Sequence, residues 1–202
     1  MEKQYQVGVI IFDEVEVLDF TGPYEVFSVS RFPGQSYDTS AQTPFEVKTI
    51  AENDKLIKCR YGLKVKPDDT FENIEQMNHF DIIVVPGGLG VRKEIYNHYL
   101  IEFIQNRQRD NTLITSVCTG ALLLAEAGLL NGKKATTHYK SLDKLAAGYP
   151  EVTVVRDQKV VDEGEIITSA GVASGIEMAL YVVEKFMGES VAYETKKFME
   201  YK

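Results

Sequence analysis

The sequence predicts an α/β fold with a largely parallel sheet, and two observations support this prediction. First, short apolar runs rich in Val and Ile alternate with helical patterns along most of the chain, which is typical of β-α units. Second, the 202 residues are 44% hydrophobic and 26% charged, the composition of a globular protein that buries one sizeable core. We therefore expect a single domain over residues 1–202.

Four apolar runs are expected to form buried strands, because each is short, bounded by turn formers and rich in β-branched residues. These strands cover residues 7–12, 45–51, 81–85 and 112–117. The helical patterns cover residues 22–31, 92–107, 119–127, 140–147, 172–187 and 190–199. Within the fifth helix, four apolar residues recur at helical spacing and are expected to pack on the core: Ile176, Leu180, Val183 and Met187.

Two further segments are expected to pair in antiparallel fashion. Residues 56–66 and 152–168 each contain extended runs separated by a turn, at 60–62 and 162–164, which favours hairpins or antiparallel edge strands. The sheet is therefore expected to be mixed. Residues 30–44 predict a long loop, because the alternating pattern resumes beyond them.

Composition and charge limit the kinds of partner. The chain has 22 Lys and Arg against 30 Asp and Glu, a net charge of −8, and its densest basic groupings are only pairs, so nucleic acid is not an expected partner. Its two cysteines lie outside any Cys-x-x-Cys motif, which argues against a disulfide scaffold or a zinc site. No run approaches the roughly 20 apolar residues of a membrane span. We expect a cytoplasmic protein with no membrane partner.

The segment 112–124, Thr-Leu-Ile-Thr-Ser-Val-Cys-Thr-Gly-Ala-Leu-Leu-Leu, is the strongest candidate for chemistry. A buried strand ends at Cys118 and a helix follows at once, and small residues two positions before and after, Ser116 and Gly120, suit a sharp strand-to-helix turn. The helix N-terminus favours the thiolate, so we expect a lowered thiol pKa and a nucleophile. Cys59 has no such turn and is expected to be an ordinary buried cysteine.

Asp19 follows the first strand and has two interpretations. It can be the N-cap of the helix that contains Pro23 and Glu25. Alternatively, because its loop and Cys118 both lie at carboxyl ends of strands, where ligands bind in open α/β sheets, its carboxyl can meet the thiolate and act as a proton donor.

Glycines and a histidine supply the remaining candidates. Gly87 and Gly88 follow a third strand, and such a turn either brings backbone N–H groups to an oxyanion hole or is a flexible turn without a ligand. His138 follows a short strand-like run and can reach the same crevice or be unrelated to function. His79 and His98 are expected on the surface.

Together these motifs resemble the ThiJ/PfpI superfamily of class I glutamine amidotransferase-like proteins. The Val-Val-Pro-Gly-Gly turn, the Ser-Val-Cys-Thr-Gly elbow, the Ala-Thr-Thr-His-Tyr segment and the stretch 168–175 occur in that order, and the resemblance runs from Val7 to about Gly188. It implies a flavodoxin-like three-layer α/β sandwich with a mostly parallel central sheet, a cysteine nucleophile at the elbow, and a homodimer.

Within that superfamily, residues 19–27, Asp-Phe-Thr-Gly-Pro-Tyr-Glu-Val-Phe, combined with Cys118-Thr119-Gly120, look most similar to the isonitrile hydratases. The resemblance implies that Cys118 is the nucleophile, that Asp19 protonates the substrate and that Thr119 orients a water or an intermediate. The small-molecule substrate or its developing negative charge would be bound by a further set of residues, and no metal or organic cofactor is required. That set is Gly87, Gly88, Phe20, Thr21, Gly22, His138 and Gly171.

Three alternatives stay open. One is a glyoxalase-type enzyme acting on reactive carbonyls, although such relatives usually carry Glu where this chain has Asp19. The second is a non-enzymatic domain that senses redox state or a ligand, as in sensor domains fused to AraC-type regulators, but this chain has no helix-turn-helix region. The third is an interaction protein with a vestigial elbow. The protease-like branch carries Glu early and His after the cysteine, and Asp19 and Thr119 at those places argue against a peptidase.

Overall fold

The computed structural model describes residues 3–35, 37, 42–77, 80–109 and 112–202. Its strands form one large sheet and two small pairs. The strands are β1 (Tyr5–Ile10), β2 (Phe45–Ala51), β3 (Ile57–Lys58), β4 (Lys64–Val65), β5 (Asp69–Thr70), β6 (Ile82–Val85), β7 (Leu113–Val117), β8 (Lys134–Ala135), β9 (Thr153–Val154), β10 (Val160–Asp162) and β11 (Ile166–Ser169).

The large sheet has seven strands in the order β10-β11-β7-β6-β1-β2-β5. Six of them run parallel, and β10 alone pairs antiparallel, with β11 at the edge. Every residue of the central strands β6 and β7 is buried, as expected for strands covered by helices on both faces. The predicted α/β fold with a mixed, mostly parallel sheet is confirmed.

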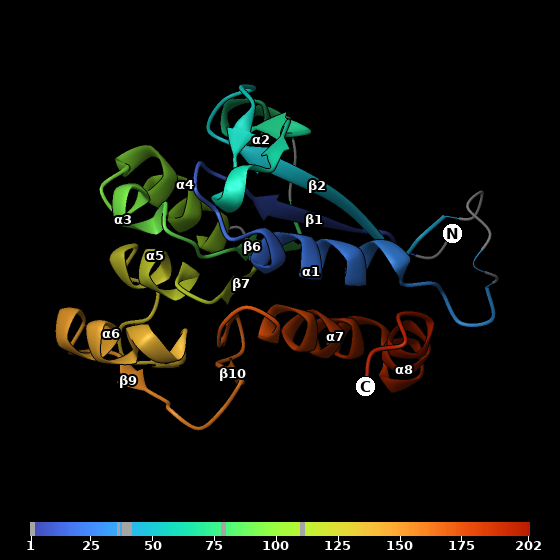
Figure 1. Ribbon diagram of the computed structural model, residues 1–202. Coiled ribbons are helices and arrows are strands. Elements are labelled where there is room, and N and C mark those ends of the chain that lie inside the picture. Colours follow the sequence, from blue (N-terminus) through green and yellow to red (C-terminus); the bar gives the residue numbers. More distant parts are fainter. Residues whose placement is uncertain (1–2, 36, 38–41, 78–79, 110–111) are drawn as a thin grey trace.

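Helices cover both faces of this sheet (Figure 1). They are α1 (Val17–Val29), α2 (Phe71–Met77), α3 (Val91–Glu94), α4 (His98–Arg109), α5 (Gly120–Glu126), α6 (Leu142–Gly148), α7 (Ser174–Met187) and α8 (Glu189–Phe198). On one face α1 packs against α7, and α7 against α8. On the other face α5 contacts α3, α4 and β7. The architecture is the flavodoxin-like three-layer sandwich that was expected.

The strand order places four loops at one edge of the sheet. From β1 the chain crosses to β2 on one side, whereas β6 leads to β7 on the other, so the direction of winding reverses between β1 and β6. Ligands in open α/β sheets bind in the crevice at such a switch point, outside the carboxyl ends of the strands. The segments after β1, β6, β7 and β11 contain Asp19, Gly87, Cys118 and Gly171 respectively.

Several element boundaries differ from the prediction. The first helix begins at Val17, five residues before the expected start, and runs through Pro23, so Asp19 lies in its first turn and is not its N-cap. The expected helix over 92–107 is interrupted, because the Asn97 side chain accepts from the backbone N–H of Leu100 and donates to Glu94, which starts α4 separately from α3. The short elements β5 and α2 were not predicted.

The two expected hairpins are present in modified form. β3 pairs antiparallel with β4, and β10 pairs antiparallel with β11, around the predicted turns. The segment at Thr153–Val154 does not join the second hairpin; it pairs in parallel with β8 instead. The described parts of the predicted 30–44 loop contain no helix or strand, and residues 36 and 38–41 of it lie outside the described residues, as does His79.

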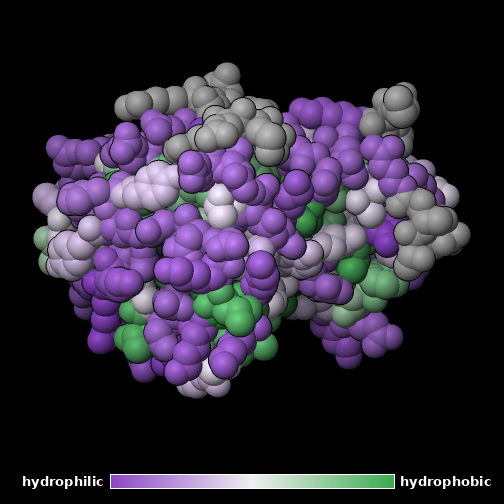
Figure 2. Space-filling model, turned by 90° about the horizontal axis from the view of Figure 1, so that it is seen from above, coloured by the Kyte–Doolittle hydropathy of each residue, from purple (hydrophilic) through white to green (hydrophobic). Residues whose placement is uncertain are grey.

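The surface seen from above is mostly hydrophilic, with apolar side chains in separate small groups (Figure 2). Among the described residues, no helix is long and apolar enough to cross a membrane.

Candidate active site

The strand-to-helix turn at Cys118 is a strained elbow held from several sides. Cys118 has φ of 56°, in the left-handed region that side chains rarely adopt. Its backbone N–H is accepted by the carbonyls of Ser169 at 3.1 Å and Ala170 at 3.0 Å, and the Thr137 hydroxyl donates to its carbonyl at 2.7 Å. These bonds tie β7 to the loops after β11 and β8. They fix the direction of the sulfur, as expected where strain serves a site.

Glycine is required immediately after this elbow. A Cβ at Gly120 would overlap the carbonyl oxygen of Val85, because the first turn of α5 lies directly against the end of β6. The small residue inferred from the sequence pattern is therefore explained by backbone contact. At Ser116, the other small position, the hydroxyl is buried and has no hydrogen-bond partner among the described residues.

Asp19 lies beside the cysteine and is completely buried. Its Oδ2 accepts the backbone N–H of Gly87 at 3.1 Å, whereas Oδ1 is buried with no hydrogen-bond partner among the described residues. The carboxyl and the Cys118 thiol are close enough for each to shift the pKa of the other. The early start of α1 explains this placement: only from its first turn does the Asp19 side chain reach the elbow.

Burial dominates the ionisation of this pair. It raises the pKa of Asp19 to about 7, against the lowering effects of Cys118 and of the Gly87 N–H. Burial also raises the pKa of Cys118 to about 12, and the charge of Asp19 adds to that increase, while hydrogen bonds from Thr119 oppose it. The expected low thiol pKa is therefore wrong. The helix N-terminus favours the thiolate, but burial and the neighbouring Asp19 carboxylate raise the thiol pKa by more than the helix lowers it.

Thr119 and the two glycines after β6 form one unit. The backbone N–H of Gly88 donates to the Thr119 hydroxyl at 3.0 Å, and a Cβ at Gly87 would overlap both the hydroxyl and the backbone nitrogen of Thr119. The backbone N–H groups of Gly87 and Gly88 are thus committed to Asp19 and Thr119. They do not form the expected oxyanion hole, and instead they position the two side chains that flank Cys118.

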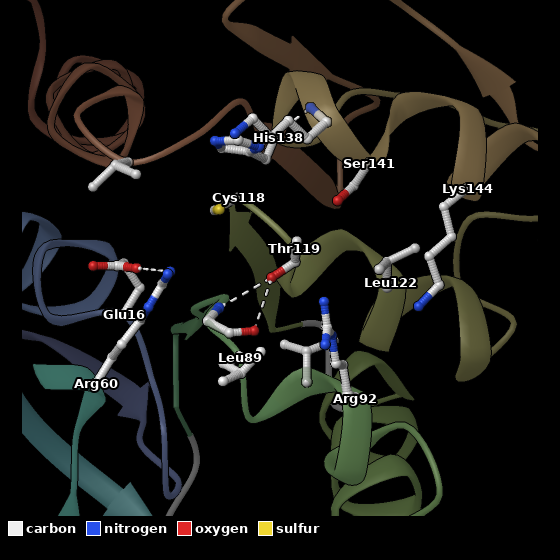
Figure 3. A pocket seen from close by; sticks show the side chains of 14 residues that line it. Glu16, Arg60, Leu89, Arg92, Cys118, Thr119, Leu122, His138, Ser141 and Lys144 are labelled. Atoms are coloured by element: carbon white, nitrogen blue, oxygen red, sulfur yellow. Dashed lines mark hydrogen bonds and ion pairs between the residues drawn. The ribbon is translucent and has the colours of Figure 1, made fainter.

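A cavity of about 360 Å³ opens above Cys118 and Thr119 (Figure 3). It lies between the elbow, the loop before α3, the segment that leads into α6 and the hairpin β3–β4. Its lining residues are Glu16, Arg60, Gly88, Leu89, Val91, Arg92, Cys118, Thr119, Leu122, His138, Lys140, Ser141, Lys144 and Val172. Glu16 and Arg60 form an ion pair at 2.7 Å.

His138 lines this cavity with its ring against Gly171, where a Cβ would overlap the imidazole. Its Nδ1 accepts the backbone N–H of Lys140 at 3.2 Å, which leaves the proton of the neutral ring on Nε2. Burial and the charge of Lys140 lower the pKa of His138. The neutral imidazole is therefore the main form at neutral pH. Gly171 leaves room for this ring because it has no Cβ.

Three residues expected to bind substrate lie elsewhere. Phe20 is buried in the core at 3% exposure, the Thr21 hydroxyl donates to the carbonyl of Val17 within α1, and Gly22 packs against Ile176 of α7. None of them lines the cavity. The physical reason is the start of α1 at Val17: helical geometry directs Asp19 toward Cys118, Phe20 into the core and Gly22 toward α7. Asp19 itself is likewise not part of the cavity lining.

Several lining residues were not predicted, among them Glu16, Arg60, Arg92 and Lys144. A charged side chain on a surface helix or hairpin carries no sequence pattern that distinguishes it from an ordinary solvated residue. The only available signal was nearness in the sequence, since Glu16 lies three residues before Asp19 and Arg60 directly follows Cys59. No group of His, Cys, Asp and Glu in the described part of the chain is arranged to hold a metal ion.

The fold and the site define a flavodoxin-like α/β protein whose cysteine sits at a strand-to-helix elbow beside a buried carboxyl. The chain belongs to the DJ-1/PfpI family, whose model matches residues 5–185. It is 33% identical over 196 residues to the isonitrile hydratase of Pseudomonas putida, covering 97% of this chain and 78% of that protein.

Two further relatives bear on the site. The glutathione-independent glyoxalase DJR-1.2 of Caenorhabditis elegans is 30% identical over 151 residues, covering 75% of this chain and 78% of that protein. A ThiJ/PfpI family protein from Pseudomonas syringae has a similar crystal structure, with a TM-score of 0.84 and 26% identity, covering 98% of this chain and 76% of that chain. The expected superfamily is thereby confirmed.

Proposed function

We propose that the chain is a cysteine-dependent hydratase that converts an isonitrile into an N-substituted formamide through a thioimidate. The observation that carries the proposal is the buried pair of Cys118, which lines a small cavity, and Asp19, which lies beside the thiol and whose Oδ1 lacks any partner among the described residues. The similarity to an isonitrile hydratase over nearly the whole chain supports the same reaction.

The pair suits the first step because it holds a single proton once the pH exceeds about 7. The thiol pKa lies above the carboxyl pKa, so the resting form is a thiol beside a carboxylate, and its reactive tautomer is a thiolate beside a carboxylic acid. In that tautomer, Asp19 gives its proton to the isonitrile carbon while the Cys118 sulfur forms a bond to the same carbon. The product is a neutral thioimidate, and Asp19 is left as a carboxylate.

Water completes the reaction. Asp19 takes a proton from the attacking water and passes it to the substrate nitrogen, and the oxygen bonds to the thioimidate carbon. The carbon–sulfur bond then breaks, the formamide leaves, and the hydroxyl proton returns to the Cys118–Asp19 pair. Thr119, whose hydroxyl is fixed by Gly88, is the polar group that orients the water. The net reaction adds one water to the isonitrile and restores the starting Cys118–Asp19 pair.

A reactive carbonyl is the second candidate substrate, because the chain is also 30% identical to a glyoxalase. The same thiol would add to the aldehyde carbon. A redox-sensing domain has less support, because oxidation of a thiol requires thiolate character and burial raises the pKa of Cys118.

Turnover assays separate these functions. The chain is incubated with a panel of neutral and carboxylated alkyl isonitriles and, in parallel, with methylglyoxal, and formamide or lactate formation is followed. We expect formamide formation that Cys118→Ala abolishes and that Asp19→Asn reduces by about 10²–10⁴-fold. Cys59→Ala is the matched control, since Cys59 is also buried but lies outside the cavity. No turnover across the isonitriles, or full turnover in the Cys118 variant, overturns the proposal.

We also propose that the chain works as a homodimer in the cytoplasm. Both cysteines are free, as is usual in a reducing compartment. Large apolar side chains are exposed on the first turn of α1 and around the β3–β4 hairpin, namely Leu18, Leu56, Tyr61 and Leu63. This cluster adjoins Arg60 at the cavity, and a second subunit would cover it.

A further inference from the structure

The cavity above Cys118 is strongly cationic, although the chain as a whole carries a net charge of −8. Four cationic side chains line it, Arg60, Arg92, Lys140 and Lys144, against a single carboxylate, Glu16. Glu16 is already paired with Arg60 at 2.7 Å. Three positive charges thus face this small volume without a neutralising carboxylate in its lining.

Two of these cations have no protein partner of their own. Among the described residues, no hydrogen bond or ion pair is recorded for Arg92 or Lys144, whereas the adjacent Lys93 faces Glu94 at 4.0 Å. Arg92 rises from α3 and Lys144 extends from α6, and both point toward the space beside Leu122 (Figure 3). Lys140 lies over the ring of Tyr139 at 5.6 Å. Cations from two helices therefore converge on the side of the cavity away from Glu16.

Arg92 and Lys144 do not act on the reacting thiol. The pKa of Cys118 responds chiefly to burial, to Asp19 and to Thr119, and neither of these two cations is among its causes. Besides the cations, Glu16, His138 and the residues at the elbow, the lining is apolar or neutral: Leu89, Val91, Leu122, Ser141 and Val172. A cationic region beyond the nucleophile is suited to hold a part of the substrate that does not react.

We propose that the substrate carries a small oxyanion, of the carboxylate or phosphate type, on the substituent of its isonitrile nitrogen, and that Arg92 and Lys144 bind it. This inference rests on the proposed hydratase function and names its substrate class. The guanidinium of Arg92 offers a planar pair of donors to such an oxyanion, and Lys144 adds a mobile ammonium. The reacting carbon then lies at Cys118, at the other end of a cavity of about 360 Å³.

The first experiment compares isocyanoacetate with its methyl ester, which has the same chain and isonitrile but no charge. We expect kcat/KM for the acid to exceed that for the ester by about tenfold or more at low salt, within the range that electrostatic attraction supplies. Raising the salt from about 0.01 M to about 1 M shortens the screening length from about 30 Å to about 3 Å and should remove most of the preference.

The second experiment removes the cations. In the Arg92→Gln/Lys144→Gln double variant, the ratio of acid to ester kcat/KM is expected to fall by about tenfold. Lys93→Gln is the matched control, because Lys93 neighbours Arg92 on α3 but is 85% exposed and lies outside the cavity. Calorimetry with N-formylglycine, the product of isocyanoacetate hydration, gives a readout without turnover, and the double variant should weaken its binding similarly.

The outcomes are distinguishable. Turnover of the ester with no preference for the acid, or a preference unchanged in the double variant, overturns the oxyanion site and leaves the hydratase function intact. No turnover of either compound, or of the neutral isonitriles, removes the hydratase function and this inference with it. Competition by acetate and by inorganic phosphate identifies the oxyanion by the lower inhibitory concentration, and inhibition by neither counts against the site.

Discussion

At the scale of single residues, Asp19 has an environment far from the ordinary one of a carboxyl group. A carboxyl at 0% exposure whose Oδ1 has no partner among the described residues is costly to ionise, and a folded chain keeps such a group where chemistry needs it. The proposed hydratase reaction needs a proton donor near neutral pH beside a sulfur. The same burial that makes Asp19 a good acid makes Cys118 a reluctant thiolate, so the two act only as a pair.

The pH dependence of turnover tests this pairing. Below about pH 7 both groups are protonated, and the tautomer with a thiolate is then absent. We expect kcat/KM to rise with pH through an apparent pKa of about 7 and to stay level above it, because the thiol pKa is much higher. Asp19→Asn should leave a small residual rate without this rise. A wild-type profile that is flat from about pH 5 to about pH 8 contradicts the assignment.

Burial of the Asp19 carboxyl should also lower the stability of the fold when this group is ionised. The pKa of Asp19 is raised from 3.8 to about 7, so the folded chain binds more protons than the unfolded chain between those values, and stability falls as pH rises through that window. At about pH 8 we expect Asp19→Asn to raise the free energy of unfolding by about 2–4 kcal/mol, measured by urea denaturation.

The control for this prediction is the same comparison of Asp19→Asn with the wild type at low pH. Near pH 3 and below, Asp19 is mostly protonated in both states, and the difference between Asn and Asp should shrink to about 1 kcal/mol or less. An equal gain at low and high pH would falsify the electrostatic explanation, since it would then reflect packing. A loss of stability at about pH 8 contradicts it directly.

At the scale of elements, the backbone contact between α5 and β6 sets the geometry of the elbow. A methyl group at position 120 meets the carbonyl of Val85, which is backbone and cannot rotate away. We therefore expect Gly120→Ala to lower the free energy of unfolding by about 2–3 kcal/mol and to reduce turnover of the remaining folded protein. Denaturant unfolding followed by circular dichroism measures the first effect.

Gly148→Ala is the comparison for this substitution. Gly148 ends α6, and a Cβ there has open space on all sides. Alanine should change stability by no more than about 1 kcal/mol and favour the helix slightly. Similar losses at positions 120 and 148 would show that the contact with Val85 has no special role.

Elements with a clear repeating pattern could be predicted from the sequence. Helix boundaries that depend on tertiary packing or on a side-chain cap could not. The 45–51 strand is reproduced at both ends, and the helices near 172–187 and 190–199 are correct to within two residues, because apolar periodicity is strong in all three. The start of α1 was missed because Pro23 looks like a first-turn residue, whereas tertiary contacts with α7 hold the helix through it. The break at Asn97 arises from a side-chain cap to Leu100 that no local pattern shows.

The candidate site divides in the same way. Cys118, Asp19 and Thr119 were named from motifs, and the structure places them together; their catalytic roles stay predictions. Arg92 and Lys144 were not named, since each enters the cavity only because α3 and α6 lie on either side of it. Long-range contact, and not residue type, makes them part of the site.

At the scale of the whole molecule, a reversal of winding between β1 and β6 gathers four loops around one cavity. The β3–β4 hairpin is docked onto the loop before α1, through hydrogen bonds from Arg60 to Val15 and from Glu14 to Lys58. Its Arg60 lines the cavity, whereas Leu56, Tyr61 and Leu63 are exposed and Ile57 is buried in the core. The cavity wall and the exposed apolar cluster thus share one small element, and we expect that covering the cluster would also stabilise the wall.

This arrangement predicts a dimer that buries the apolar cluster. Two chains of 22.7 kDa should give a mass near twice that value by light scattering. Leu56 and Leu63 are 61% and 47% exposed, so replacing both by Asp should not disturb the core, but it places charges in the contact and should yield monomers. Tyr193→Asp is the control, because Tyr193 is 63% exposed on α8 and should leave the mass unchanged. A monomeric wild-type chain contradicts the dimer, and a dimeric double variant contradicts its location, because the charges would then lie outside the contact.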